Sequence, residues 1–169
     1  MKATMIALLT LLTFHANAQT QKAAPSVKGK FYLYIDDSIH LYLNGTEILA
    51  LENTWKSTQT REVVLKAGDR IVARIGNAAG ARGFMLLFVS SGLRQCVQFT
   101  HSSFKNLPDP GATDFTPDAI HSARTAKQDK TNNRQPLPFK NRSEWVWGET
   151  DSSTLGAIVT AEMFRPLSR

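Results

Sequence analysis

Cysteine is nearly absent from this sequence, which contains only Cys96. A single thiol excludes an internal disulfide and the paired-cysteine motifs of structural zinc sites. Cys96 lies in the stretch Arg94–Phe99, where we expect it to be a small buried core residue, as unpaired cysteines usually are. A chain of 169 residues can bury a substantial core without such cross-links.

Familiar catalytic motifs are also missing. The histidines form no HExxH pattern, and the sequence contains no CxxC and no GxSxG, so zinc-hydrolase and serine-nucleophile chemistry have no motif in their favour. A glycosidase needs two carboxylates that face one cleft, whereas the acidic residues here are typical of turns. We therefore expect that the protein is not an enzyme and keep a small hydrolase as a third alternative.

No apolar run approaches the roughly 20 residues that a membrane-spanning helix requires. The apolar run at 5–14 follows a lysine and precedes the small residues Ala-Asn-Ala, which is the order typical of a secretory signal peptide. We predict that residues 1–18 are a signal peptide and that the protein is secreted or periplasmic, without a stable membrane span. The alternative is a short N-terminal helix that tethers the protein.

The charge of the chain is moderately basic, with a formal net value of +6 at pH 7. Its clearest cationic cluster lies within residues 124–142, in a polar segment that is typical of a solvated loop. Export also argues against a nucleic-acid partner. We therefore predict no nucleic-acid binding and expect the partner to be a glycan or a cell-surface protein.

Apolar residues recur at every second position between Phe31 and Phe99, in short runs separated by turn residues. This pattern is typical of an all-β sandwich or barrel. Asn44-Gly45 favours a type I′ turn, so the runs on either side of it are predicted to form a hairpin. With two closing strands after residue 143, the prediction is an all-β, antiparallel β-sandwich, a jelly roll of about eight strands.

One long irregular connection, residues 101–142, interrupts this pattern with five prolines and many polar residues. Loops of this length are uncommon in compact domains and are usually either functional or disordered. We expect Phe104, Leu107, Phe115 and Ile120 to pin parts of it to the sandwich, and residues 117–126 to form a short helix. The predicted organisation is a tail at 19–30 and a single domain at 31–169.

Asp36 and Asp37 are the polar residues that interrupt the first two apolar runs. Two adjacent carboxylates could bind a hard cation such as Ca²⁺, which prefers six to eight oxygen ligands and would need further donors such as Asn77. The alternative is an Asx turn, in which the Asp side chains bond to nearby backbone amides. Asp36 and Asp37 are therefore the candidate metal ligands, and Ca²⁺ is the candidate cofactor.

The aromatic residues supply candidate ligand contacts. Trp55 is expected in a loop after the first hairpin, where an exposed ring could stack on a sugar. Trp145 and Trp147 are expected to pack in the sheet or core. Trp55, Asn77 and Asp37 are therefore predicted as the ligand-binding residues.

The stretches IDDSIHLYLNGTEIL and VVLKAGDRIVARIGNAAGARGFMLLF resemble the galactose-binding-domain-like jelly rolls that are appended to many secreted glycosidases and surface proteins. The later EWVWG and EMFR resemble the closing strands of that group. The first stretch is also similar to PA14-type domains, in some of which an Asp-Asp pair holds a Ca²⁺ that contacts a sugar; Asp36 and Asp37 match that pair. Because these motifs are largely structural, the resemblance implies a fold more than a ligand.

These observations lead to two competing predictions of function. The first is a secreted, non-catalytic module that binds carbohydrate, with assistance from Ca²⁺. The second is a structural or protein-interaction component of the cell envelope that binds no sugar and docks a partner through the long loop.

Overall fold

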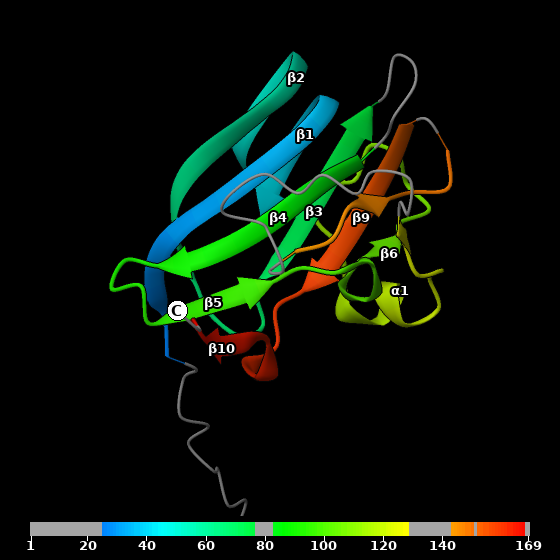
Figure 1. Cartoon of the computed structure of the whole chain (residues 1–169). Coiled ribbons are helices and arrows are strands. Elements are labelled where there is room, and N and C mark those ends of the chain that lie inside the picture. The colour runs from blue at the N-terminus through cyan, green and yellow to red at the C-terminus, as the bar shows by residue number, and fades with distance from the viewer. Residues whose placement is uncertain (1–24, 77–82, 129–142, 151, 168–169) are drawn as a thin grey trace, which may run out of the picture.

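A computed structural model of the chain describes residues 25–76, 83–128, 143–150 and 152–167, apart from the side chains at 53 and 55–57. The predicted all-β, antiparallel class is confirmed, because the described residues form ten strands of one strongly curled antiparallel sheet (Figure 1). The strands are β1 (Val27–Leu43), β2 (Thr46–Leu65), β3 (Arg70–Gly76), β4 (Gly83–Ser90), β5 (Gln95–Gln98), β6 (Lys105–Asn106), β7 (Lys127–Gln128), β8 (Val146–Trp147), β9 (Ser152–Ile158) and β10 (Phe164–Pro166). The helical elements are η1 (His101–Ser103), α1 (Pro117–His121) and η2 (Ala161–Met163).

The long strand β1 belongs to both layers of the fold. Residues 29–36 of β1 pair with β4, whereas residues 38–43 pair with β3. On its other edge, β1 pairs with β2 along its whole length. The strand order β10-β5-β4-β1-β3-β9-β6 therefore divides in the middle of β1. We call the first group of strands the β4 layer and the second group the β3 layer.

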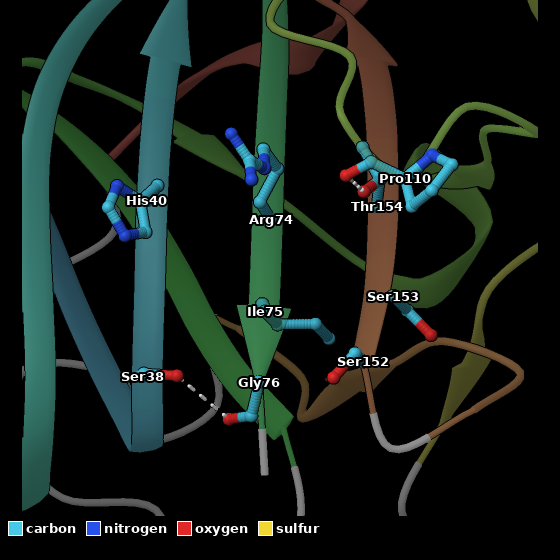
Figure 2. A pocket seen from close by; sticks show the side chains of 9 residues that line it. All are labelled: Ser38, His40, Arg74, Ile75, Gly76, Pro110, Ser152, Ser153 and Thr154. Atoms are coloured by element: carbon cyan, nitrogen blue, oxygen red, sulfur yellow. Dashed lines mark hydrogen bonds between the residues drawn. The ribbon is translucent and has the colours of Figure 1, made fainter.

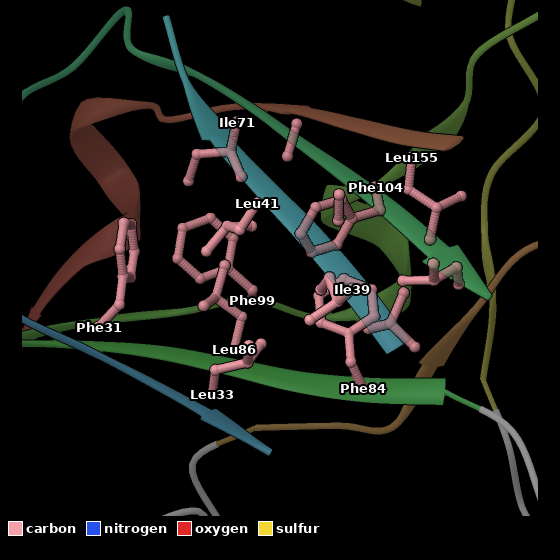
Figure 3. Packing of buried hydrophobic residues seen from close by; sticks show 14 of the residues in the cluster. Phe31, Leu33, Ile39, Leu41, Ile71, Phe84, Leu86, Phe99, Phe104 and Leu155 are labelled. Carbon is pink, nitrogen blue, oxygen red and sulfur yellow. The ribbon is translucent and has the colours of Figure 1, made fainter. Parts of the chain in front are cut away.

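The hydrophobic core lies between these two layers. Alternate residues of β1, β3, β4 and β9 point inward, as period-two patterning requires, and Figure 3 shows their side chains meeting. Aromatic rings fill much of this space: Phe84 packs edge-to-face on Phe104, with ring centroids 5.2 Å apart, and Phe31 packs in the same way on Phe88 at 5.8 Å. Such pairs add to the free energy gained by burial alone.

The β4 strand is apolar on both faces, and both faces are buried. Phe84, Leu86 and Phe88 face the core, while Met85 and Leu87 belong to a second cluster on the outer face of the β4 layer. That second cluster also contains Tyr32, Tyr34, Val89, Cys96, Trp145 and Leu167. β4 is thus a central strand that is covered on both sides, and the predicted burial of Cys96 and of both late tryptophans is confirmed.

The Asn-Gly hairpin forms where it was predicted. Asn44 and Gly45 both adopt positive φ angles, of 50° and 80°, which a type I′ turn requires. The side chain of Asn44 then joins this turn to the next one: its Nδ2 donates to Asp69 Oδ1 at 2.9 Å, and its Oδ1 accepts from the Arg70 amide at 2.9 Å. Asp69 Oδ2 accepts from the Lys66 amide at 2.8 Å.

The prediction that Trp55 lies in a loop after the first hairpin is wrong, because residues 52–60 belong to β2. β2 stays hydrogen-bonded to β1 through the bend of the sheet, with register shifts that absorb it. A bulge lets a strand turn without losing its partner. Apolar and polar residues do not alternate regularly in this stretch, because the register of β2 against β1 shifts where β2 passes from one layer to the other.

The first part of the long connection packs against the β3 layer. Phe104, Leu107 and Ile120 are buried, β6 pairs with β9, and the short helix α1 ends at His121 instead of continuing to residue 126. Residues 129–142 and the predicted signal peptide lie outside the described residues. Among the helices that the described residues form, none has the length and apolar character that crossing a bilayer demands.

Candidate functional site

The predicted Asp36–Asp37 pair occupies the bend of β1. Asp37 has a positive φ of 77°, and the register between β1 and β2 shifts on both sides of the pair. Asp36 pairs with Gly83 of β4, whereas Ser38, two residues later, pairs with Gly76 of β3. The pair therefore marks the point where the strand passes from one layer to the other.

The structure brings two of the predicted ligand-binding positions together at this bend. The backbone of Trp55 pairs with Asp36, and Thr54 pairs with Asp37. Trp55 thus lies in a strand, not in the loop that the sequence led us to expect, and its side chain is outside the described part of the structure. Asn77 also lies outside the described residues.

Calcium would find few ligands among the described residues at the bend. Asp36 is buried, with 7% of its surface exposed, and its charge adds to the effect of burial in raising the pKa of the nearby Tyr34 hydroxyl. In the described ranges, no group of three or more His, Cys, Asp or Glu side chains gathers in a way that could hold a metal ion. A Ca²⁺ ion here would need its remaining donors from backbone carbonyls or from residues beyond those ranges, so the metal site stays a prediction.

A pocket of about 180 Å³ opens on the outer face of the β3 layer, beginning one residue beyond the Asp pair (Figure 2). Three neighbouring strands supply its lining, and Pro110 reaches over it from the long connection. The lining residues are Ser38, His40, Arg74, Ile75, Gly76, Pro110, Ser152, Ser153 and Thr154.

Strand register places the polar side chains of this pocket in two rows. Ser38, Gly76 and Ser152 are paired across β1, β3 and β9, and His40, Arg74 and Thr154 form the next row on the same face. Residues two apart along a strand share a face, so the core residues between them point the other way. The outward residues of these strands line the pocket, and the inward residues of the same strands form the core.

Contacts at the edges of the pocket fix its shape. Thr154 Oγ1 donates to the carbonyl of Pro110 at 2.8 Å and so holds the long connection against β9. Gly76 contributes no side chain to the floor of the pocket, and the Ser38 hydroxyl occupies the space beside it: a Cβ at Gly76 would lie 2.6 Å from Ser38 Oγ, which donates to the Gly76 carbonyl at 3.4 Å. Ser38 and Ser152 flank this floor from the two neighbouring strands (Figure 2).

His40 is held by two carboxylates of β2. Its Nδ1 lies 2.9 Å from Glu47 Oε2, and its Nε2 lies 2.8 Å from Glu52 Oε1. Ionised carboxylates only accept hydrogen bonds, so both bonds form only when both ring nitrogens carry protons. The hydrogen bonds that His40 donates to Glu47 and then to Glu52 accordingly raise the pKa of His40. Where both bonds are present, the His40 ring is an imidazolium.

Two arginines on this face of β3 have different surroundings. Arg70 makes a bidentate pair with Asp114, with Nε–Oδ1 and Nη2–Oδ2 distances of 2.6 and 2.8 Å. Arg74 donates through Nη1 to the neutral hydroxyl of Tyr42 at 3.3 Å, and within the described residues no carboxylate forms a salt bridge with it. Arg74 is half-buried.

This pocket was not predicted from the sequence. Its residues come from three strands that are far apart along the chain, and only the register of β1 with β3 and of β3 with β9 brings them together. One signal was available: His40 and Arg74 stand at outward positions of strands whose inward positions are apolar. Neither residue is needed there for packing, which is a reason to examine them for function.

The pocket offers several kinds of contact to a polar ligand. Hydroxyls can donate or accept hydrogen bonds, and the guanidinium of Arg74 can donate several in a fixed plane. These groups stand on paired strands, and rigid elements hold a binding site more accurately than loops do. A polyhydroxylated or charged small unit suits this set of groups.

Comparison with known proteins identifies one similar stretch. Over 54 residues, the chain is 43% identical to the alpha-agarase of Thalassotalea agarivorans, which corresponds to 31% of this chain and 4% of that protein. The chain therefore spans a small fraction of the length of the relative that it matches. No protein-family model matches the chain, and no solved structure is significantly similar to it. The findings support an antiparallel all-β unit with a partial likeness to an agarase, and they assign no specific family.

Proposed function

We propose that this chain is an exported, non-catalytic carbohydrate-binding module whose glycan binds in the outer pocket of the β3 layer. The observation that carries the proposal is the pocket itself, which polar side chains from three paired strands line. Small-molecule sites use a few accurately placed polar groups to fix a ligand. At about 180 Å³, the pocket is smaller than the roughly 300 Å³ at which drug-sized sites begin, so it suits one sugar unit of a longer chain.

The partial likeness to an alpha-agarase supports a carbohydrate ligand. The matched stretch is a small part of a much longer protein, as expected for a module that is joined to an enzyme. The resemblance of the sequence to galactose-binding-like jelly rolls points in the same direction. Agarose is built from galactose units, so agarose and its oligosaccharides are the first ligands to test.

Affinity electrophoresis in agarose-containing gels, followed by calorimetry with agarose oligosaccharides, tests the proposal. We expect Ser152→Leu to weaken binding strongly, because it places an apolar side chain at the mouth of the pocket. Ser152 is exposed, so this change should leave the unfolding temperature nearly unchanged. Thr60→Leu is the matched control, since Thr60 is an exposed hydroxyl residue of β2 that pairs with Tyr32 in the other layer.

The outcomes separate this pocket from the site predicted at the bend. Loss of binding in Trp55→Ala, with full binding in Ser152→Leu, would place the glycan at the bend instead. A chelator such as EDTA should leave binding unchanged, because the described lining of the pocket needs no metal; loss on chelation would favour a Ca²⁺ site at Asp36 and Asp37. A well-folded sample that binds no glycan on a broad array would overturn the proposal.

A further inference from the structure

We infer that the glycan unit in this pocket carries an anionic group, and that Arg74 is the residue that binds it. The inference rests on the proposed function and specifies its ligand class: a sugar with a sulfate ester or a uronate carboxylate. Both groups present oxygens that can accept two parallel N–H bonds from a guanidinium. Arg74 and Arg70 differ in how their charges are balanced.

Arg70 and Arg74 share a strand, a face and a half-buried environment. The positive charge of Arg70 is balanced by Asp114, which also accepts a hydrogen bond from the Phe115 amide at 2.9 Å. Among the described residues, the guanidinium of Arg74 forms no ion pair with a carboxylate; it donates to the Tyr42 hydroxyl and interacts at longer range with the charge of Glu47. A guanidinium has five N–H donors, so most of the donors of Arg74 remain available to a ligand.

The nearby carboxylates are already committed to other groups. Glu47 accepts hydrogen bonds from His40 and from Tyr42, and Glu52 bonds to His40. Both acids lie on β2, which β1 separates from β3. Neither forms an ion pair with Arg74, although the charge of Arg74 helps to lower the pKa of Glu47. With His40 protonated, the charges of His40, Arg74, Glu47 and Glu52 sum to zero. An anionic ligand would therefore bind at Arg74 because of the available N–H donors there, and not because this group of residues has a net positive charge.

The position of Arg74 explains how such a ligand would be oriented. Arg74 stands between His40 and Thr154 in its row, two residues along β3 from Gly76, and its guanidinium is turned toward Tyr42, away from Gly76 (Figure 2). A sulfate or carboxylate bonded to Arg74 would lie in the row of His40 and Thr154, and the hydroxyls of Ser38 and Ser152 stand in the neighbouring row. A half-buried charge that forms no ion pair carries a desolvation cost, and an anionic ligand would offset that cost on binding.

The experiment compares three oligosaccharides of equal length by calorimetry: neutral agarose, a sulfated galactan and a polyuronate. We expect the wild-type protein to bind at least one of the anionic chains about tenfold more tightly than agarose, in keeping with a hydrogen-bonded charge pair. Arg74→Gln should abolish this preference, so that the anionic chains bind no more tightly than agarose, and Arg74→Lys should restore part of it. Added NaCl should reduce the preference, because salt screens the exposed part of the interaction.

Arg70→Gln is the matched control, since it removes the same charge from the same face of the same strand. It should lower the unfolding temperature through loss of the Asp114 pair and leave the anion preference intact. Equal affinity of the wild type for neutral and anionic chains, or a preference that survives in Arg74→Gln, would overturn the inference while the carbohydrate-binding function stands. Failure to bind any of the three chains would count against the proposed function itself, and a response to only one anionic chain would distinguish sulfate from carboxylate.

Discussion

The outer faces of the two layers differ, although one pattern of alternation builds both. On the β4 layer, the outward residues are apolar and are buried in a cluster with Trp145 and Leu167. On the β3 layer, the outward residues near Tyr42 and Val72 are covered by Leu107 and Phe115, and the polar pocket opens beside them.

This difference indicates where function resides. Outward positions that are apolar can be explained by the cover that they pack against, so they need no ligand to account for them. Histidine and arginine at outward positions gain nothing from packing and carry a solvation cost when half-buried. The comparison predicts that changes on the β4 face alter stability and that changes in the pocket alter binding.

The largest expected effect lies on the covered face. Trp145 is buried and packs edge-to-face on Tyr34, with ring centroids 5.4 Å apart. Trp145→Ala should lower the free energy of unfolding by about 3–5 kcal/mol, the usual cost of removing a large buried aromatic side chain. Urea unfolding followed by circular dichroism measures this loss, and glycan affinity under native conditions should stay at the wild-type value. Reduced affinity in a fully folded sample would break the division of roles between the two faces.

An intermediate effect is expected where hydrogen bonds hold the end of the β3 layer. Asp69 is 3% exposed and accepts hydrogen bonds from the Asn44 side chain and the Lys66 amide. Asp69→Ala should destabilise the fold by about 1–2 kcal/mol, because it leaves these partly buried donors without their acceptor. Asp69→Asn should cost less, since one carbonyl oxygen remains. Equal losses for the two variants in urea unfolding would show that the lost acceptors do not cause the effect.

The sequence was informative where structure depends on neighbours along the chain. Asn44-Gly45 identified its hairpin because positive φ angles are a local requirement, and the period-two alternation between Phe31 and Phe99 indicated the all-β class. The bend of β1 was not predictable, because it depends on which strands pair with each half of β1. The pocket depends on the same long-range register, and a carboxylate pair such as Asp36–Asp37 attracts interest whether it binds a metal or occupies a bend.

The smallest expected effect concerns His40 and the pH dependence of stability. The hydrogen bonds to Glu47 and Glu52 raise the pKa of His40 above its ordinary value of 6.5, so the stability that they add is complete below that value and is lost as the pH rises through the folded-state pKa. The bond to His40 lowers the pKa of Glu47 below 4.5. The stability that Glu47 adds is therefore complete above that value and is lost as the pH falls through the folded-state pKa of Glu47. The contribution should therefore be largest between about pH 4.5 and 6.5.

His40→Gln tests this expectation, because it removes the titrating group and retains a polar side chain. The urea midpoint of the wild type should exceed that of His40→Gln most clearly near pH 5.5, and the difference should shrink toward about pH 9. His121→Gln is the control, since His121 is an exposed residue at the end of α1 and its replacement should not alter the pH profile. The difference will be small because all three side chains of the His40 group are partly open to solvent, where ion pairs contribute little. If the difference between the two urea midpoints stays constant over this pH range, the two carboxylates do not bind a protonated His40. The pocket would then contain a neutral histidine beside Arg74, which is always charged.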